Sequence, residues 1–321
     1  MGRKNGFDLE DETQEHQQFQ KIKGKQGSAG KTRKKQSYES SVDVQRWLQL
    51  QSLKEGDLSK AAFNPTFLAG RRDAAWILSS LTDFYEQDLI TDVLYAVKSG
   101  KEANVYCCAA HPSTGLDYVA AKIYRPRMFR SLSNDAIYRQ GRTQRDLDGR
   151  VVRNNRHHRD AFKSERGRAA QIAFWIDYEF QTQHLLSLAG ADVPRPLAHI
   201  GNAVLMEYVG EVDEPAPLLQ QVTLTREEAA PLFKSILHNI EIFIAHNRIH
   251  GDLSAYNILY WRGDVKLIDF AQSVDPSQSQ DVFPLFVRDI ERVCHYFAHY
   301  GIVSDAYTLA SDLWRRYEGS F

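Results

Sequence analysis

The sequence predicts an α+β fold in which a sheet-rich half is followed by a helix-rich half. Two observations favour it. Between residues 92 and 124, apolar and polar residues alternate around Gly-containing turns, which is typical of short antiparallel strands. After residue 210, most of the chain carries apolar residues at the spacing of amphipathic helices. With 321 residues, the chain is long enough for one two-lobed unit or for two domains.

The composition excludes several classes of protein. Lys and Arg (40) nearly balance Asp and Glu (41), so an acidic partner would have to be met by a local patch. The cysteines Cys107, Cys108 and Cys294 have neither the spacing of a disulfide framework nor that of a zinc site. The chain does not start with the apolar core of a signal peptide and contains no run of eighteen apolar residues. We therefore expect a cytoplasmic protein that does not enter a membrane.

The chain divides into four parts. Residues 1–40 are rich in Gln, Lys and Gly, which predicts a disordered basic and polar tail. Residues 41–90 predict a helical extension, because VQRWLQLQSL and AAWILSSLTDFYEQDLI have helical spacing on either side of NPTFLAG. Residues 91–209 form the predicted sheet-containing lobe, and 210–321 form the helical lobe. Within the first lobe, residues 125–168 hold thirteen Lys and Arg against five Asp and Glu, which predicts an Arg-rich flexible loop.

Helical segments follow this loop. RAAQIAFWIDYEFQTQHLLSLAG has apolar residues at helical intervals and ends at Gly190, and AVLMEYVG then reads as a short buried strand. TREEAAPLFKSILHNIEIFIAHN predicts a helix with Thr225 as its N-cap. Two further helices are predicted in FPLFVRDIERVCHYFAHYGI and SDAYTLASDLWRRYEG.

The segment HGDLSAYNILYWRGDVKLIDF places Asp252, Asn257 and Asp269 in an otherwise apolar stretch. Phosphoryl-transfer enzymes use an Asp that faces the acceptor hydroxyl, then an Asn and a second Asp that bind metal, in this order. NILYW and VKLIDF predict two strands joined by an Arg-Gly-Asp turn, which would bring Asn257 and Asp269 to one rim. Such oxygen ligands suit Mg²⁺ or Mn²⁺.

Two further charged residues are candidates upstream. Lys122 is a lone cation in the β-rich run VAAKIY, where an unmatched ammonium group would be costly. Glu179 lies three and four residues after Ile176 and Trp175, so it is expected to point inward with the apolar stripe and to pair with Lys122. His250 is expected to pack and to hydrogen-bond the loop rather than to transfer protons.

The turn KSGKEANVY is the candidate nucleotide loop. A conventional kinase has several glycines over the phosphates, but here only Gly100 is present. Ser99, Lys101 and the backbone amides could take the place of the missing glycines, with Asn104 behind them.

Together, SGKEANVY, AAKIY, WIDYEF, LMEYVG, HGDLSAYNILY and LIDFAQSVD resemble the RIO-type atypical protein kinases, over roughly residues 90–300. The chain looks like a bacterial-type member, similar to the subfamily whose loop reads STGKEAN. The resemblance implies a two-lobed protein-kinase-like fold, with a small antiparallel β-sheet N-lobe and a helical C-lobe. It also implies that a conventional activation segment is lacking, and AQSVDPSQSQDVFPLF contains no A-P-E element.

The resemblance also implies roles for single residues. Lys122 would bind phosphate and pair with Glu179, and Asp252 would be the catalytic acid or base. Asp269 would hold metal and would also be a candidate nucleophile for ATPase turnover. The resemblance also implies a phosphate loop made of Ser99, Lys101, Glu102 and Asn104. The hinge that contacts adenine would consist of Met206, Glu207 and Val209. Asn257 would be a second metal ligand.

The leading functional hypothesis is an ATP-dependent serine/threonine protein kinase, using Mg²⁺ or Mn²⁺ and acting on an unidentified protein or on itself. A kinase-fold ATPase switch in ribosome biogenesis is the related hypothesis. Two alternatives stay open: a small-molecule phosphotransferase of the aminoglycoside or choline type, and an RNA- or ribosome-binding assembly factor that contacts ribosomal RNA or a pre-ribosome through the Arg-rich loop. That loop and the pair Asp269-Phe270 depart from the family pattern, which leaves kinase and ATPase outputs both open.

Overall fold

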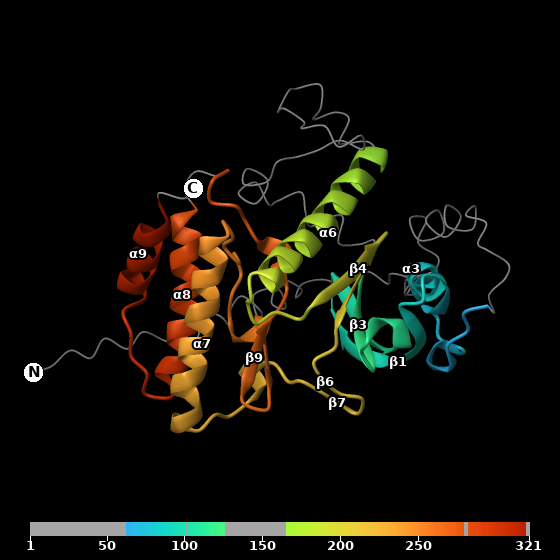
Figure 1. Ribbon diagram of the computed structural model, residues 1–321, viewed down its shortest axis with the longest axis horizontal. Coiled ribbons are helices and arrows are strands. Elements are labelled where there is room, and N and C mark those ends of the chain that lie inside the picture. The colour runs from blue at the N-terminus through green and yellow to red at the C-terminus, as the bar shows by residue number, and fades with distance from the viewer. Residues whose placement is uncertain (1–61, 101, 126–164, 279–281, 319–321) are drawn as a thin grey trace, which may run out of the picture. The chain divides into compact units, whose positions relative to one another are not determined.

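The computed structural model describes residues 62–100, 102–125, 165–278 and 282–318 (Figure 1). The predicted disordered tail, the first part of the predicted helical extension and most of the predicted Arg-rich loop lie outside these residues. Among the described residues, no helix combines the length and the apolar character needed to cross a membrane.

A sheet forms the N-terminal half, as predicted. Within the described residues, five strands pair antiparallel in the order β1-β2-β3-β5-β4. Gly100 closes the first hairpin, because its amide donates to Ala103 O at 2.9 Å. The second turn, between β2 and β3, contains Gly115, whose φ of +70° favours glycine. The strands are β1 (Ile90–Ser99), β2 (Ala103–Ala110), β3 (Tyr118–Tyr124), β4 (Pro196–Ile200) and β5 (Ala203–Glu207).

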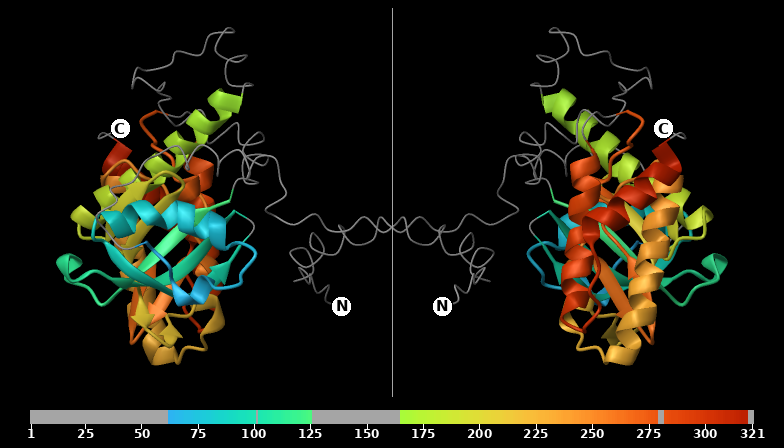
Figure 2. Two further views of the ribbon diagram at one scale, coloured as in Figure 1. Left: turned by 90° about the vertical axis from the view of Figure 1, so that its right-hand side faces the viewer. Right: turned by 90° about the vertical axis from the view of Figure 1, so that its left-hand side faces the viewer.

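One face of the sheet packs against α3 (Ala74–Glu86), as the left view of Figure 2 shows. Alternate residues of β3, Val119, Ala121 and Ile123, are fully buried in a cluster with Trp76 of this helix. Successive strand residues point to opposite faces, so these three share one side of the sheet. The helix lies within the predicted N-terminal helical extension, and its apolar stripe completes the core of the N-lobe.

The opposite face of the sheet packs against α6 (Glu165–Leu188). Tyr124 and Val204 from the sheet are buried together with Ile176 of the helix. The helix begins at Glu165, so the last four residues of the predicted loop, 165–168, are helical instead. The sequence ERGR has no apolar residue to show a helical period, and for this reason the start was missed.

The C-terminal end of α6 lies in the core of the second lobe. Leu186, Ala191 and Val193 belong to the same buried cluster as Ile240 and Phe297. Gly190, at φ +85°, ends the helix as predicted. The predicted lobe boundary at residue 209 assigned this segment to the N-lobe, and the packing shows that α6 contributes to both lobes.

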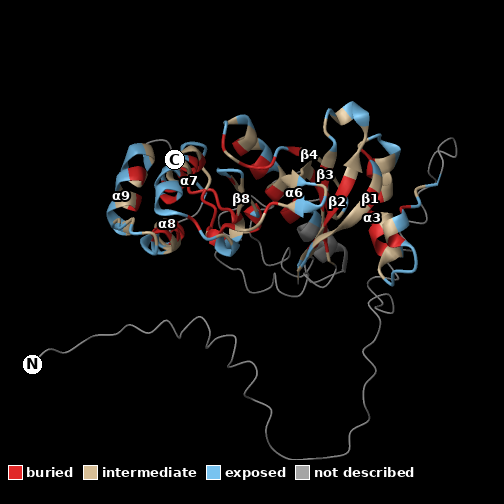
Figure 3. Ribbon diagram, turned by 90° about the horizontal axis from the view of Figure 1, so that it is seen from below, coloured by how far each residue is buried: buried red, intermediate tan, exposed pale blue. Residues whose placement is uncertain are grey.

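The helical half has the predicted helices α7 (Arg226–Ala245), α8 (Phe283–Ala298) and α9 (Ala306–Tyr317), seen together in the right view of Figure 2. Thr225 caps α7 as predicted, in a reciprocal capping box with Glu228. Figure 3 shows buried segments in the helical half as well as in the sheet-containing half. A short hairpin of β6 (Gly210–Glu211) and β7 (Glu214–Pro215) joins the lobes.

The predicted hairpin after residue 257 is present as β8 (Ile258–Trp261) and β9 (Asp264–Leu267). Its turn consists of Arg262 and Gly263, which both have positive φ, of 51° and 93°. Two such residues match the twist of a tight antiparallel hairpin. The predicted Arg-Gly-Asp turn is therefore one residue shorter than expected, because Asp264 already pairs with Trp261.

Candidate active site

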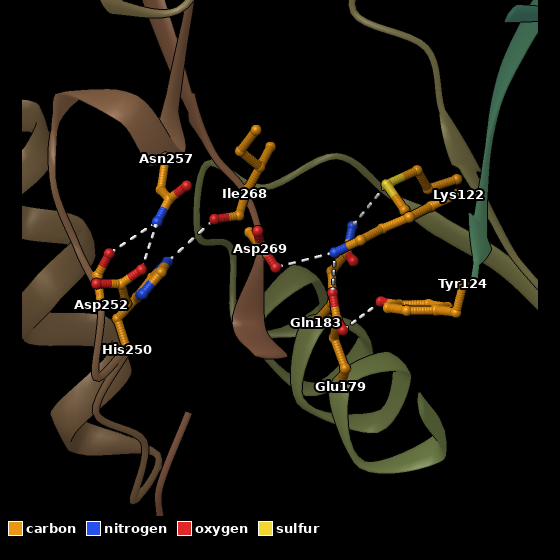
Figure 4. A network of polar contacts seen from close by, with 10 residues as sticks. Lys122, Tyr124, Glu179, Gln183, His250, Asp252, Asn257, Ile268 and Asp269 are labelled. Carbon is orange, nitrogen blue, oxygen red and sulfur yellow. Dashed lines mark hydrogen bonds and ion pairs between the residues drawn. The ribbon is translucent and has the colours of Figure 1, made fainter. Parts of the chain in front are cut away.

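Lys122 is the centre of the site. It lies on β3 between residues that face α3, so strand alternation turns its side chain to the other face of the sheet. Its Nζ donates to Glu179 Oε1 at 2.7 Å and to Asp269 Oδ1 at 2.9 Å (Figure 4). Because the side chain is only 13% exposed, these carboxylates provide the opposite charge that a buried ammonium group requires.

Glu179 is buried on the face of α6 that meets the sheet, as its spacing predicted. Tyr124, two residues after Lys122 on the same face of β3, donates its hydroxyl to Glu179 Oε2. Both carboxylate oxygens of Glu179 are thus hydrogen-bonded from one strand. Sequence reasoning missed Tyr124, although the two-residue spacing from Lys122 places it on the same face.

The charges of this cluster shift its pKa values. Burial alone would lower the pKa of Lys122, but Asp269 and Glu179 outweigh it and raise that pKa well above its ordinary value. For Asp269, burial would raise the pKa, but Lys122 outweighs it and holds the pKa below the usual value. Burial also raises the pKa of Glu179, against the opposing charge of Lys122. Near neutral pH, Lys122 is a cation and Asp269 is ionised.

Asp269 follows β9 in an uncommon backbone conformation, with φ 71° and ψ 70°. This left-handed region is unfavourable for residues other than glycine, and such strain collects at functional sites. Its side chain is 44% exposed, so it remains accessible although Lys122 contacts it. The preceding residue, Ile268, connects this cluster to the predicted catalytic loop, residues 250–257, because its amide donates to Asn257 O at 2.9 Å.

His250 has the structural role that the sequence predicted. Its Nε2 lies 3.1 Å from Ile268 O, and a carbonyl can only accept, so this nitrogen carries the proton. The buried ring packs against Phe243 and Phe270, and burial lowers its pKa. It therefore holds Ile268 in place as a neutral ring.

Asp252 and Asn257 form a second group, linked to the first through Ile268 (Figure 4). Asn257 Nδ2 donates to Asp252 O at 2.8 Å and lies 3.4 Å from Asp252 Oδ2. An amide that donates through its nitrogen leaves its oxygen as the metal-binding atom. The other Asp252 oxygen, Oδ1, accepts from Arg292 Nη1 at 2.7 Å.

Asp289 on α8 holds the backbone of the catalytic loop through hydrogen bonds. Sequence reasoning missed this residue. Its Oδ2 accepts from Gly251 N at 2.7 Å, and its Oδ1 accepts from Leu253 N at 3.0 Å. Arg288 also donates to Gly251 O. Burial raises the pKa of Asp289 to about 7, although the amide hydrogen bonds and the charges of Arg288 and Arg292 oppose this shift.

The predicted phosphate loop is placed only in part. Ser99 is exposed at the end of β1, and Glu102 is exposed in the turn just before β2. Glu102 O accepts from Arg125 N at 2.7 Å, which ties the turn to the end of β3. Lys101 lies outside the described residues.

The side chain of Asn104, the fourth residue of the predicted phosphate loop, is hydrogen-bonded inside the protein. The side chain is 3% exposed, with Nδ2 donating to Tyr106 OH at 3.0 Å and Oδ1 accepting from Arg125 Nη2 at 2.6 Å. Asn104 and Tyr106 are two residues apart on β2, and Tyr106 packs in the α3-facing cluster. Alternation along the strand thus turns the Asn104 amide away from the face that carries Lys122.

The three predicted hinge residues lie at the end of β5 and just beyond it. Met206 is half-buried, with Sδ 3.6 Å from Gln183 Nε2 on α6. The Glu207 carboxylate accepts from Arg195 N at 3.0 Å, and Val209 O accepts from Ala216 N at 3.0 Å. The side chain of Glu207 is therefore used inside the protein, so an adenine contact here would have to come from backbone atoms.

The donor set fits a divalent cation that is shared with phosphate. Among the described residues, no group of three or more His, Cys, Asp or Glu side chains could form a metal site alone. Asn257 and Asp269 offer oxygen ligands, and Mg²⁺ characteristically combines one or two protein oxygens with water and substrate phosphates. The pair is thus suited to a metal that arrives with a nucleotide.

Comparisons with known proteins agree with this geometry. A family model described as "RIO domain" matches residues 104–309. The serine/threonine-protein kinase RIO1 of Caenorhabditis elegans is 27% identical over 209 residues, which cover 64% of this chain and 37% of that protein. The RIO-type serine/threonine-protein kinase Rio1 of Haloferax volcanii is 28% identical over 213 residues, covering 66% of each chain. The chain thus spans well under half the length of the worm relative that it matches.

A solved structure is also similar. The crystal structure of the Rio2 kinase from Chaetomium thermophilum has a TM-score of 0.45 and 18% identity, covering 86% of this chain and 88% of that chain. The family model covers more than half of the sequence and includes Lys122, Glu179 and the catalytic loop. The chain therefore belongs to the RIO domain family, as its motifs predicted.

Proposed function

We propose that this protein is an ATP-dependent phosphotransferase of the protein-kinase type, acting on serine or threonine hydroxyls. One observation carries the proposal: Lys122 Nζ contacts both Glu179 from α6 and Asp269 from the C-lobe, at 2.7 and 2.9 Å. Phosphoryl transfer needs a positive charge that is held in place, here by two carboxylates, to bind the phosphates of a nucleotide between two lobes. The matched relatives are named serine/threonine-protein kinases, which supports the same acceptor class.

The nucleotide would be held by the cluster around Lys122. Lys122 would donate to phosphate oxygens, and Glu179, fixed by Tyr124, would keep the ammonium group in position. Asp269 and the Asn257 amide oxygen would hold Mg²⁺, or Mn²⁺ in its place. When bound, the metal neutralises charge on the phosphates. Asp269 is ionised in this arrangement, so it is prepared for that role.

The acceptor would meet Asp252. Its carboxylate is 49% exposed and is oriented by Arg292 and Asn257. In the transfer step, the acceptor oxygen forms a bond to the γ-phosphorus while the bond from that phosphorus to the ADP oxygen breaks. The hydroxyl proton passes to Asp252.

The proposed physiological context goes further than the site. A role in ribosome biogenesis is implied by the family resemblance alone, and contact with ribosomal RNA would involve the Arg-rich loop, most of which lies outside the described residues. These functions and the cytoplasmic location stay predictions. Autophosphorylation and ATP hydrolysis are separate outcomes of the experiment below.

The test follows phosphate from labelled ATP into four acceptors: a generic protein, the chain itself, small amino-alcohols and water. We expect metal-dependent transfer to protein hydroxyls. Lys122→Met and Asp269→Asn should each lower turnover by roughly two to three orders of magnitude, because each removes a preorganised charge. Lys234→Met, which removes an exposed lysine on α7, is the matched control and should have no effect.

Three outcomes would contradict the proposal. Full activity in Asp269→Asn would remove Asp269 from the site. Transfer to amino-alcohols alone would favour a small-molecule phosphotransferase. Release of phosphate to water alone would favour an ATPase.

A further inference from the structure

Arg292 stands beside the proposed catalytic carboxylate. On the same helix, α8, Arg288 and Asp289 contact backbone atoms of the catalytic loop. Arg292, one turn further on, reaches past the backbone and contacts the side chain of Asp252, with Nη1 2.7 Å from Oδ1. One face of α8 thus holds both the backbone of the loop and its reactive group.

The catalytic loop supplies no cation of its own. The segment HGDLSAYN, residues 250–257, contains neither lysine nor arginine. Two residues after Asp252, Ser254 uses its Oγ to accept from Tyr256 N at 3.3 Å, which shapes the turn. Among the ion pairs of the described residues, Arg292 is the cation that contacts Asp252.

The two contacts on Asp252 restrict its carboxylate. A charge-assisted hydrogen bond at 2.7 Å is among the stronger polar contacts. Asn257 Nδ2, 3.4 Å from Oδ2, lies on the other side of the same group. Asp252 is 49% exposed, so without Arg292 its side chain would rotate into water, because little packing holds it.

We propose that Arg292 is a positioning residue for the phosphoryl transfer. It occupies Oδ1 of Asp252 and thereby presents Oδ2 to the acceptor hydroxyl. The inference rests on the proposed function, because it assigns the acceptor side of that same site. Misplacing a proton acceptor by about 1 Å can cost on the order of a hundredfold in rate.

The test is a double-mutant cycle between Arg292 and Asp252. Arg292→Gln should lower kcat by about tenfold to a hundredfold, and Arg292→Lys, which keeps the charge, should lose less. In an Asp252→Asn background, the same Arg292→Gln change should cost less than about twofold, because its target is already gone.

Two further measurements separate positioning from folding. The dissociation constant for Mg-ATP and the thermal unfolding midpoint should be unchanged in Arg292→Gln, since an exposed ion pair adds little stability. Arg316→Gln is the matched control, because it breaks an exposed ion pair of 2.9 Å with Glu241 on the far helix α9. It should leave kcat unchanged.

Each failure has its own result. If wild-type protein transfers phosphate and Arg292→Gln matches it, the inference is wrong and the proposed function stands. If Arg292→Gln lowers kcat equally in both backgrounds, Arg292 does not act through Asp252, and the inference is again wrong. If the wild-type protein transfers no phosphate, the proposed function fails, and the inference fails with it.

Discussion

Asp289 shows how a single buried group supports the catalytic loop. Its two oxygens accept the amides of Gly251 and Leu253, which flank Asp252. Burial raises its pKa to about 7, so the carboxyl group changes charge close to neutral pH. The loop that carries Asp252 is therefore linked to a proton equilibrium.

This linkage predicts a pH-dependent contribution to stability. The folded protein binds a proton at Asp289 at pH values where the unfolded chain, with an ordinary value of 3.8, has already released it. The free energy of unfolding contributed by Asp289 should therefore fall as the pH rises from about 4 to about 7, by roughly 1.4 kcal/mol for each unit of pKa difference.

The measurement compares denaturant unfolding of the wild-type protein and Asp289→Asn between about pH 5 and about pH 8. The variant cannot titrate at this position, so the stability of the wild type relative to the variant should decrease as the pH rises. The part of the stability difference that does not change with pH reports only the hydrogen-bond acceptor that the variant lacks. If the whole difference is independent of pH, or if it grows as the pH rises, Asp289 does not have a raised pKa.

Single residues also show what the sequence could predict about the site. Lys122 and Glu179 could be predicted because an isolated charge in an apolar pattern implies a partner. The inward orientation of the Asn104 side chain could not be predicted, because a motif fixes the position of a residue but not the strand face to which it points. Arg292 was missed because its partner, Asp252, lies forty residues away and no local pattern connects them.

At the scale of elements, α6 is the helix that couples the two lobes. Its middle carries Glu179 against the sheet, and its C-terminal end carries Leu186 into the core of the C-lobe. The helical period and Gly190 predicted the helix and its end. Its packing against two lobes could not be predicted, since periodicity shows which residues are buried but not against which element.

This arrangement predicts different effects for two neighbouring leucines. Leu186 is fully buried, so Leu186→Ala should lower the free energy of unfolding by about 2–5 kcal/mol. Leu188, at the end of the same helix, is 76% exposed, so Leu188→Ala should change it by less than about 0.5 kcal/mol. Denaturant unfolding of both variants is the measurement, and equal effects would mean that α6 is not anchored in the C-lobe core.

At the scale of the described part of the chain as a whole, the sequence predicted both the sheet-rich half and the helix-rich half. It did not predict the strand order, in which β3 pairs with β5 although α6 and the Arg-rich loop lie between them in the sequence. That pairing brings Lys122 opposite Val204 and aligns the sheet face with α6. Contacts over such separations depend on tertiary packing, which local patterns do not contain.

The most direct test of the two-lobe site is a crystal structure of this chain with a non-hydrolysable ATP analogue and Mn²⁺, with the metal located by its anomalous scattering. We predict a manganese peak between the Asn257 amide oxygen and the Asp269 carboxylate, with Lys122 Nζ on a phosphate oxygen and Glu179 still paired to it. An ordered nucleotide whose metal lies away from Asn257 and Asp269, or whose phosphates do not meet Lys122, would contradict the account.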